Sequence, residues 1–305
     1  MDLPDNALKR TTLGLINADL IVQNMYASGT RDWRADGSLS LATIAALSRS
    51  YNLYTIMERF VSWYRRGTFT ALGQRQPVGP VTQTAIMRYM KNHDPFSSGV
   101  FEGQDQGNAA LLRITPMVLY LHAEYGPEFV NNDPAMLSLH QVTGLTHNQP
   151  LALMTNGFYA MLVNQLLEGQ PLQASFETAI SQGYDYYAHH RFFAGHLAAF
   201  NRLNLPDFKH TPQKDITASD QALDTLEATI WVAFHSQTYQ DALNLTGELS
   251  GTPARVLPLV GALSALLFDD PVVIPDDWLG QGGLNQIKRI LMVANRVGAF
   301  NPVNV

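Results

Sequence analysis

The chain has no cysteine among its 305 residues, which excludes disulfides, thiolate nucleophiles and cysteine-ligated metal sites. Charged residues are also sparse: they make up 15% of the chain, and the formal net charge is −6. Because general binding of nucleic acid needs a basic face, this balance argues against a nucleic-acid partner. No apolar run reaches about 18 residues, the length of a membrane-spanning helix, and the opening segment MDLPDNALKR has no apolar signal core. We therefore expect a cytoplasmic protein without a membrane partner.

A stretch toward the carboxyl end has the clearest helical pattern. Asp224–Phe234 places apolar residues at three- and four-residue intervals, as an amphipathic helix does. Thr252 is a suitable N-cap, and Pro253 suits the first turn of a helix. Val256–Leu267 has almost no polar atom and is too short to span a bilayer, so we expect a helix buried on all sides. Pro258 lies inside this helix and is expected to kink it.

The motifs of this stretch resemble those of the ADP-ribosylglycohydrolase family. The family pattern is a DTLEAALW-like helix, a YEEAV segment and an NLGGDTDT turn that opens a buried AIAGAL helix. This chain reads DTLEATIW at Asp224–Trp231, YQDAL at Tyr239–Leu243 and GAL at Gly261–Leu263. With no gap between these anchors, the family's DTDT falls on TPAR at residues 252–255. In the family those aspartates hold two magnesium ions, and this chain has neither aspartate.

Two helices near the amino end carry further family motifs. Thr11–Val22, TTLGLINADLIV, resembles the family's opening LGxxxGDALG helix and keeps Asp19. Trp33–Leu47, WRADGSLSLATIAAL, resembles the family's WTDDTSMxLALAxxL, and its helix is expected to begin near Ser38. Of the paired family aspartates before that helix, the chain keeps only Asp36.

Arginines occupy positions at which the family places magnesium ligands or their neighbours. The family's Thr-Asp-Asp before the second helix becomes Arg34, Ala35 and Asp36, and the other turn contributes Arg255. Guanidinium groups at these places would repel magnesium, yet could pair with a carboxylate or a ligand phosphate. The plainer alternative is that both arginines point to solvent. The resemblance also implies a glutamate loop after the first helix, and Gln23–Arg31 offers no acidic residue for it.

Two more motifs imply contacts to a nucleotide. GNAALLRITP is similar to the family's GNGxxMRxxP, which implies that the backbone amides of Gly107, Asn108 and Ala109 face a diphosphate. LTHNQPLAL is similar to the family's LTHxxPLA, and its His147 matches the residue that packs beside the ribose. Judged from the residues alone, a single histidine near a proline is more often structural.

The resemblance extends from Thr11 to Leu291 and rests on several motifs in order. It implies an all-α fold, with a single compact ADP-ribosylglycohydrolase-like domain of a dozen or so helices over residues 1–305. No strand-like alternation of useful length competes with this reading. We expect two of the helices at Leu151–Leu167 and Phe176–Asn201.

The loss of magnesium ligands decides the functional prediction. We expect a pseudoenzyme that binds no magnesium or other cofactor and takes ADP-ribose, an ADP-ribosylated protein or a protein partner in the family cleft. Two alternatives stay open: a metal-independent hydrolase acting on an ADP-ribosyl or similar glycosidic substrate, and an interaction protein that blocks a partner such as an ADP-ribosyltransferase. The candidate residues are Asp36 and Asp19 for catalysis and, for ligand binding, Gly107, Asn108, Ala109, His147, Arg34, Arg255 and Thr252.

Overall fold

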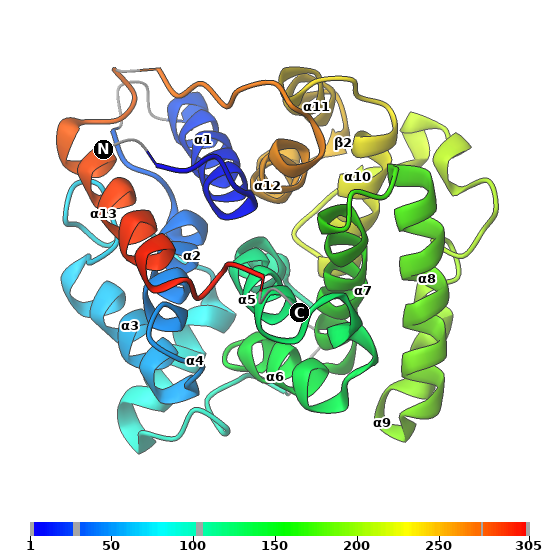
Figure 1. Cartoon of the computed structure of the whole chain (residues 1–305), viewed down its shortest axis with the longest axis horizontal. Coiled ribbons are helices and arrows are strands. Elements are labelled where there is room, and N and C mark those ends of the chain that lie inside the picture. The colour runs from blue at the N-terminus through cyan, green and yellow to red at the C-terminus, as the bar shows by residue number, and fades with distance from the viewer. Residues whose placement is uncertain (1–2, 27–30, 102–105, 276, 303–305) are drawn as a thin grey trace.

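Helices form almost all of the regular structure in the described part of the chain. The computed structural model describes residues 3–26, 31–101, 106–275 and 277–302, and Figure 1 shows its helices surrounding a common interior. The α-helices are α1 (Ala7–Tyr26), α2 (Ala35–Leu47), α3 (Leu53–Arg66), α4 (Pro80–Asn92), α5 (Thr115–Tyr125), α6 (Asp133–Gly144), α7 (Pro150–Leu167), α8 (Leu172–His189), α9 (Arg191–Ala194), α10 (Ala222–Phe234), α11 (Tyr239–Gly247), α12 (Leu257–Leu267) and α13 (Gln281–Val297).

Short elements complete the described structure and leave its class unchanged. The 3-10 helices are η1 (Asn108–Arg113), η2 (Pro127–Asn131), η3 (Leu197–Phe200), η4 (Phe208–His210), η5 (Gln213–Asp215) and η6 (Pro253–Arg255). The two strands among the described residues, β1 (Thr217–Ala218) and β2 (Ser250–Gly251), pair in parallel over two residues each. The predicted all-α fold is therefore confirmed.

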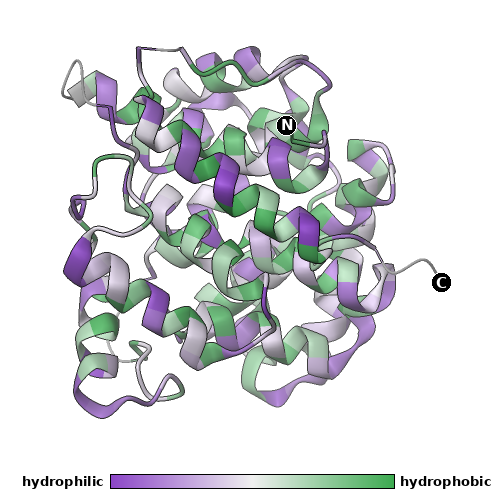
Figure 2. Ribbon diagram, turned by 60° about the vertical axis from the view of Figure 1, so that its left-hand side comes forward, coloured by the Kyte–Doolittle hydropathy of each residue, from purple (hydrophilic) through white to green (hydrophobic). Residues whose placement is uncertain are grey.

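Local sequence signals set several helix ends, as α3 illustrates. Asn52 accepts a hydrogen bond from the Thr55 amide at 3.0 Å and so caps the first turn. Gly67 ends the helix in the left-handed conformation, with φ 65°, which favours glycine. Figure 2 shows hydrophilic and hydrophobic residues alternating along the outer helices, as expected where one face packs on a core.

α1 and α12 make the most extensive contact between two helices in the described residues. They lie side by side (Figure 1) and approach closely where Gly14 meets Gly261. A Cβ added to Gly14 would lie 2.2 Å from the Gly261 carbonyl oxygen, and one added to Gly261 would lie 2.5 Å from the Gly14 carbonyl oxygen. Only glycine permits this approach of two backbones. Tyr239 Oη donates to the Gly14 carbonyl at 3.0 Å, so α11 is tied to the same contact.

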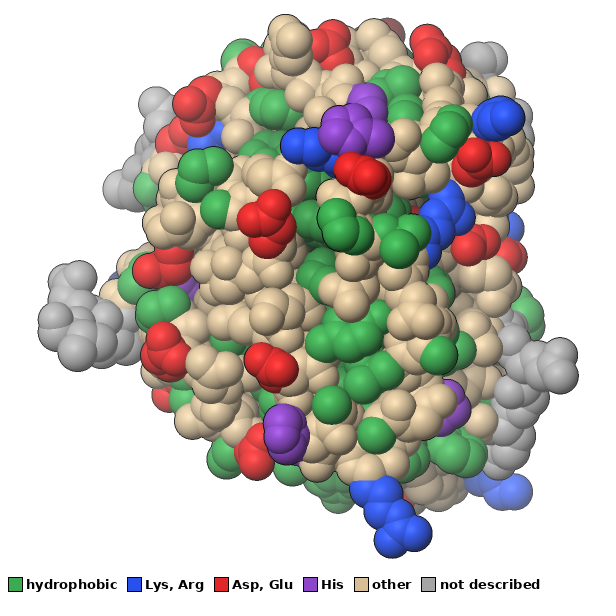
Figure 3. All heavy atoms as spheres, turned by 90° about the vertical axis from the view of Figure 1, so that its right-hand side faces the viewer, with side chains coloured by type: hydrophobic (Ala, Val, Ile, Leu, Met, Phe, Trp, Pro, Cys, Tyr) green, Lys and Arg blue, Asp and Glu red, His purple; other side chains and the backbone are tan. Residues whose placement is uncertain are grey.

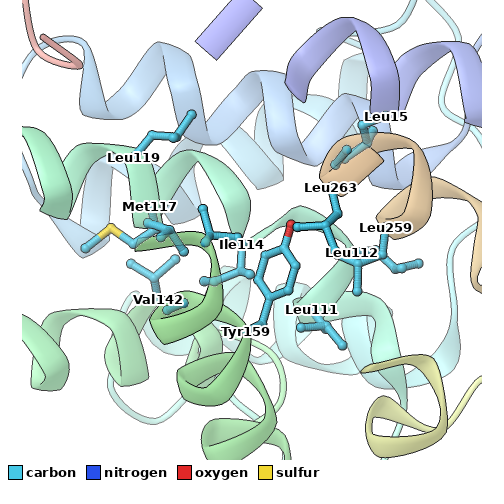
Figure 4. Close-up of a cluster of buried hydrophobic side chains, with 14 of the residues drawn as sticks. Leu15, Leu111, Leu112, Ile114, Met117, Leu119, Val142, Tyr159, Leu259 and Leu263 are labelled. Atoms are coloured by element: carbon cyan, nitrogen blue, oxygen red, sulfur yellow. The ribbon is translucent and has the colours of Figure 1, made fainter. Parts of the chain in front are cut away.

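Buried apolar side chains next to α12 hold η1 in place. Figure 4 shows Tyr159 of α7 near Leu111 and Leu112 of η1, with Leu259 of α12 beside them. The Tyr159 hydroxyl lies 3.0 Å from Thr115 Oγ1, so this buried polar group has a partner. η1 is thereby anchored in apolar packing while its first residues reach the candidate site.

Three expectations about α2 and α12 are wrong in detail. α2 begins at Ala35 rather than near Ser38, whose Oγ donates to the Arg34 carbonyl at 3.1 Å inside the first turn. The buried helix α12 is present, but Pro258 is its second residue. A proline in the first turn removes no helical hydrogen bond, so it does not interrupt the helix. Thr252 makes no capping hydrogen bond through its side chain, because η6 lies between it and α12.

The segment expected as one long helix at Phe176–Asn201 is also divided. α8 ends at His189 because His190 adopts an extended conformation, with φ −105° and ψ 103°, and α9 and η3 follow as separate short helices. The loop expected at Gln23–Arg31 starts later than predicted, since α1 continues to Tyr26, and residues 27–30 lie outside the described residues. None of the helices in the described ranges is long and apolar enough to cross a membrane.

Candidate functional site

The candidate site begins at the amino-terminal end of α2. Trp33 is fully buried, and its Nε1 donates to the Phe69 carbonyl at 2.9 Å. The buried Asp32 accepts hydrogen bonds from the Ala71 amide and from Gln76 Nε2, both at 2.7 Å. These bonds hold the loop between α3 and α4 against the start of α2, where its last residues form one wall of the site.

Arg34 connects the two turns that carry the family motifs. Its Nη1 donates to the Ala254 carbonyl of η6 at 2.8 Å, and its Nη2 lies 3.3 Å from Asp36 Oδ2. The Arg34 side chain is 18% exposed and the Asp36 side chain 10%, so water screens this pair less than it would a surface pair. Of the alternatives that the sequence left open for Arg34, the structure shows pairing with a carboxylate, that of Asp36. Arg255, in contrast, is exposed and makes no ion pair within the described residues.

Asp19 lies in α1, completely buried. Its Oδ2 accepts a hydrogen bond from the Gly37 amide at 2.8 Å, in the first turn of α2. Burial, with the charge of Asp36 as a second cause, raises the pKa of Asp19 to about 7, whereas the charge of Arg34 acts in the opposite direction. Asp19 does not line the cavities of the site. Its hydrogen bond therefore supports the start of α2.

Asn108 connects three elements of the site through hydrogen bonds. Its Nδ2 donates to Thr225 Oγ1 at 2.8 Å and to the Arg255 carbonyl at 2.9 Å, which ties η1 to α10 and η6. Its backbone amide donates to the Asp220 carbonyl at 2.7 Å. This amide, one of the three that the resemblance directs toward a diphosphate, already donates a hydrogen bond within the protein. A diphosphate in the site would need donors other than the Asn108 amide.

His147 is 2% exposed and lines the same cavity as Asp36. Its Nδ1 lies 2.8 Å from Thr146 Oγ1. Burial lowers the pKa of His147 to about 3, and the positive charge of Arg113 contributes in the same direction. The imidazole is therefore uncharged at neutral pH and cannot act there as a general acid in its protonated form.

These elements enclose a cavity of about 150 Å³. An adjoining cavity of about 490 Å³ shares Arg34, Arg255 and residues 77–80 with it. Thr252 lines only the adjoining cavity. The sequence-predicted residues that line the first cavity are Arg34, Asp36, Gly107, Asn108, Ala109, His147 and Arg255.

Two charged residues at or beside this site were not predicted from the sequence. Asp220 lines the first cavity and precedes the DTLEATIW helix, but no motif marks it. Arg113 is completely buried beside His147, and the GNAALLRITP motif that contains it could have drawn attention to it. Its Cζ lies 4.9 Å from the ring centre of Phe60. Burial lowers the pKa of Arg113 to about 10, with Asp36 acting oppositely, so the guanidinium stays charged at neutral pH.

The residues of the site do not fit a dinuclear magnesium centre. Magnesium takes near-octahedral oxygen ligands, usually with carboxylates among them. Asp36 is the one aspartate of the two family turns, and the Arg34 guanidinium lies 3.3 Å from it. Ala35, Thr252 and Ala254 offer no carboxylate. Across the described ranges, no three His, Cys, Asp or Glu side chains gather to hold a metal ion. No step through magnesium follows from this arrangement.

A further cavity, of about 590 Å³, is lined by residues of α6, α7, α8 and α9. Its lining includes Leu137, Tyr186, Phe192 and Phe193. Figure 3 shows hydrophobic side chains gathered along the middle of the side of the molecule that α8 occupies. None of the sequence-predicted site residues lines this cavity.

The chain is therefore an all-α protein whose candidate ligand site is a pair of adjoining cavities, lined by the turns at which helices begin. Residues 5–299 match the family model described as ADP-ribosylglycohydrolase, and the chain belongs to that family. It is 24% identical over 304 residues to ADP-ribosylarginine hydrolase Tri1 of Serratia proteamaculans (strain 568), covering 96% of this chain and 75% of the relative. It is 20% identical over 264 residues to ADP-ribosylarginine hydrolase Tri1 of Pseudomonas putida (strain GB-1), covering 86% of this chain and 65% of the relative.

A solved structure shares the fold. It is a chain titled "ADP-ribosylglycohydrolase-related protein complex", and it superposes with a TM-score of 0.65 at 20% sequence identity. The match covers 95% of this chain and 99% of the other, so the two share the fold over nearly their whole length.

Proposed function

We propose that this ADP-ribosylglycohydrolase-family protein binds ADP-ribose, free or attached to protein, without a dinuclear magnesium centre. Hydrolysis of the ADP-ribosyl bond is then absent or very weak. One observation carries the proposal: the Arg34 guanidinium bonds to the Ala254 carbonyl and lies 3.3 Å from Asp36, between the two turns that carry the family's metal-binding motifs. A fixed positive group there neutralises the remaining carboxylate, as a bound cation would otherwise do.

Arg255 and the relatives support ADP-ribose as the ligand. Arg255 is exposed and lines both adjoining cavities, so its charge is available to a diphosphate. His147 lines the first cavity beside it, with an uncharged ring that can pack against a sugar. The two curated relatives are named ADP-ribosylarginine hydrolases, which makes arginine-linked ADP-ribose the first modified protein to test.

Calorimetric titration of ADP-ribose, with magnesium and with a chelator, tests the binding part of the proposal. We expect the same affinity under both conditions. An assay of ADP-ribose release from arginine-modified protein tests the catalytic part, with an active family member as the positive control. Magnesium-dependent release at a rate comparable with that control would refute the proposal, and so would two manganese ions bound in the cleft in anomalous scattering.

A metal-independent hydrolase is the second candidate, and the position of Asp36 favours it. Asp36 lines the cavity, as does Asp220, so a carboxylate is available to a substrate as general acid or base. Release that persists in the chelator and is lost in Asp36→Asn would establish this alternative. A protein that binds no ADP-ribose at all would instead be an interaction protein, and binding to an ADP-ribosyltransferase would then be the next measurement.

A further inference from the structure

A line of buried hydrogen bonds leads from Arg113 to the candidate cleft. Arg113 Nη2 donates to Thr146 Oγ1, and Thr146 Oγ1 lies 2.8 Å from His147 Nδ1. Arg113 and Thr146 are completely buried, and His147 is 2% exposed. The other end of the imidazole, Nε2, makes no hydrogen bond to any of the described residues, and His147 lines the cavity. This series of hydrogen bonds therefore ends at His147 Nε2, which is available to a ligand or to water.

The direction of these bonds follows from the chemistry of their members. A guanidinium only donates hydrogen bonds, so Thr146 Oγ1 must accept from Arg113. The buried Thr146 hydroxyl then has one proton to place, and His147 Nδ1 is the acceptor within reach. An unmade hydrogen bond at a buried hydroxyl is costly, so the proton goes to Nδ1. Because Nδ1 accepts, the ring proton of the uncharged His147 sits on Nε2.

We infer that Arg113 and Thr146 are positioning residues that hold the His147 ring with its proton on Nε2, so that the cleft presents a fixed hydrogen-bond donor to an oxygen of its ligand. The charge of Arg113 supports this in a second way, because it opposes protonation of the same ring. Asp36 is the negative group that attracts Arg113. The buried arginine therefore has a role in the cleft although it does not line it.

The contact between Nε2–H and a ligand rests on the proposed function, whereas the tautomer of the His147 ring does not depend on it. In the proposed complex, Nε2–H would donate to an oxygen acceptor such as a hydroxyl, ring or phosphate oxygen of ADP-ribose. A group that only donates, such as a free guanidinium, would find no acceptor at this atom. His147 would thus select for the sugar-phosphate part of a modified arginine over the arginine itself.

Nitrogen-15 NMR of histidine-labelled protein tests the ring state in the absence of any ligand. At neutral pH we expect His147 to show a protonated, pyrrole-type Nε2 and an unprotonated, pyridine-type Nδ1, with the resonance assigned from His147→Asn. Thr146→Val keeps the shape but removes the hydroxyl, and we expect it to give a mixture of tautomers. Thr146→Ser keeps the hydroxyl and should retain the wild-type pattern.

Thr143→Val is the matched control for the loss of a buried hydroxyl. Thr143 is also completely buried, but its Oγ1 donates to the Leu139 carbonyl at 3.0 Å and does not contact the His147 ring. We expect this variant to keep the wild-type tautomer. Arg113→Met should also give mixed tautomers, and the Thr146 variants decide the matter if that protein does not fold. A proton on Nδ1 in the wild type, or an unchanged tautomer in Thr146→Val, would overturn the inference.

Calorimetric titration of ADP-ribose into the same variants tests the contact with the ligand. We expect Thr146→Val to bind about 5-fold more weakly, as loss of one oriented neutral hydrogen bond predicts, with recovery in Thr146→Ser. A changed tautomer with unchanged affinity would show that the ligand does not use Nε2–H, and would overturn that part. If the wild type binds no ADP-ribose, the proposed function fails, while the NMR result still decides the state of the ring.

Discussion

Removal of the Arg34 side chain is expected to destabilise the fold, because that side chain holds two turns together. Arg34→Ala would leave Asp36 without its ion-pair partner at 3.3 Å and the Ala254 carbonyl without its donor at 2.8 Å. The Asp36 side chain is only 10% exposed, so water can compensate little of that loss. The charge of Arg113 remains nearby and reduces the effect, since Asp36 and Arg113 attract each other.

The size of the effect follows from these contacts. Removing one partner of a well-buried ion pair costs about 3–5 kcal/mol, and this pair is partly reached by water. A lost hydrogen bond to a carbonyl adds about 1 kcal/mol. We therefore expect Arg34→Ala to lower the free energy of unfolding by about 2–4 kcal/mol. Arg255→Ala should lower it by less than about 1 kcal/mol, because that side chain is exposed and unpaired within the described residues.

Urea unfolding at neutral pH, with Arg255→Ala as the matched arginine control, measures both values. A double-mutant cycle of Arg34→Ala and Asp36→Ala separates the pair from the rest, and we expect a coupling energy of at least about 1 kcal/mol. Small, additive effects in Arg34→Ala and Asp36→Ala would refute the reasoning. They would mean that solvent screens the pair and that Arg34 does not replace a cation in the site.

The remaining predictions concern helix packing, pH and the ligand. Gly261→Ala should lower the free energy of unfolding by more than about 2 kcal/mol, since its methyl would meet a carbonyl at 2.5 Å, whereas Gly247→Ala, with open space around its Cβ, should not, as urea unfolding would show. The pKa of Asp19 is raised to about 7, so the stability that its protonated form contributes is complete below about pH 3.8 and is lost as the pH rises to about 7. Asp19→Asn should flatten this decline, which unfolding curves at pH 5 and pH 8 would detect. Arg255→Ala should weaken ADP-ribose binding about 10-fold at nearly unchanged stability, and equal affinities in calorimetry would remove Arg255 from the ligand site.

The helical class could be predicted from local patterns because they depend on short-range geometry. The apolar spacing in Asp224–Phe234 and the uninterrupted apolar run toward Leu267 correspond to α10 and α12. Errors arose where the same residue type has two uses. Pro258 could be a kink or a first-turn residue, and Ser38 could be a cap or an internal helix residue. The choice depends on where the preceding backbone enters the helix, which the packing of η6 and of α2 decides.

The membership of the candidate site was also largely accessible from the sequence, through ordered motifs. Those motifs brought together residues far apart in the chain, such as Arg34, Asn108, His147 and Arg255, which line one cavity. They did not separate the roles of the two arginines. Arg34 is largely buried and forms a hydrogen bond and an ion pair, whereas Arg255 is exposed, although each stands at a turn where the family places magnesium ligands.

The sequence by itself determined the helical class of this protein and the absence of the family aspartates, because both are properties of residue types at known spacings. The tertiary structure alone decided the protonation and the hydrogen bonding of the titratable residues at and beside the site. Asp19 has a raised pKa because α2 and its neighbours bury it. The Nδ1 atom of His147 is hydrogen-bonded to Thr146, whose hydroxyl in turn accepts a hydrogen bond from Arg113, a residue distant in the sequence. Protonation and hydrogen-bond direction depend on burial and on partners contributed by other elements. Such partners are set by packing across the whole chain, and no local pattern records them.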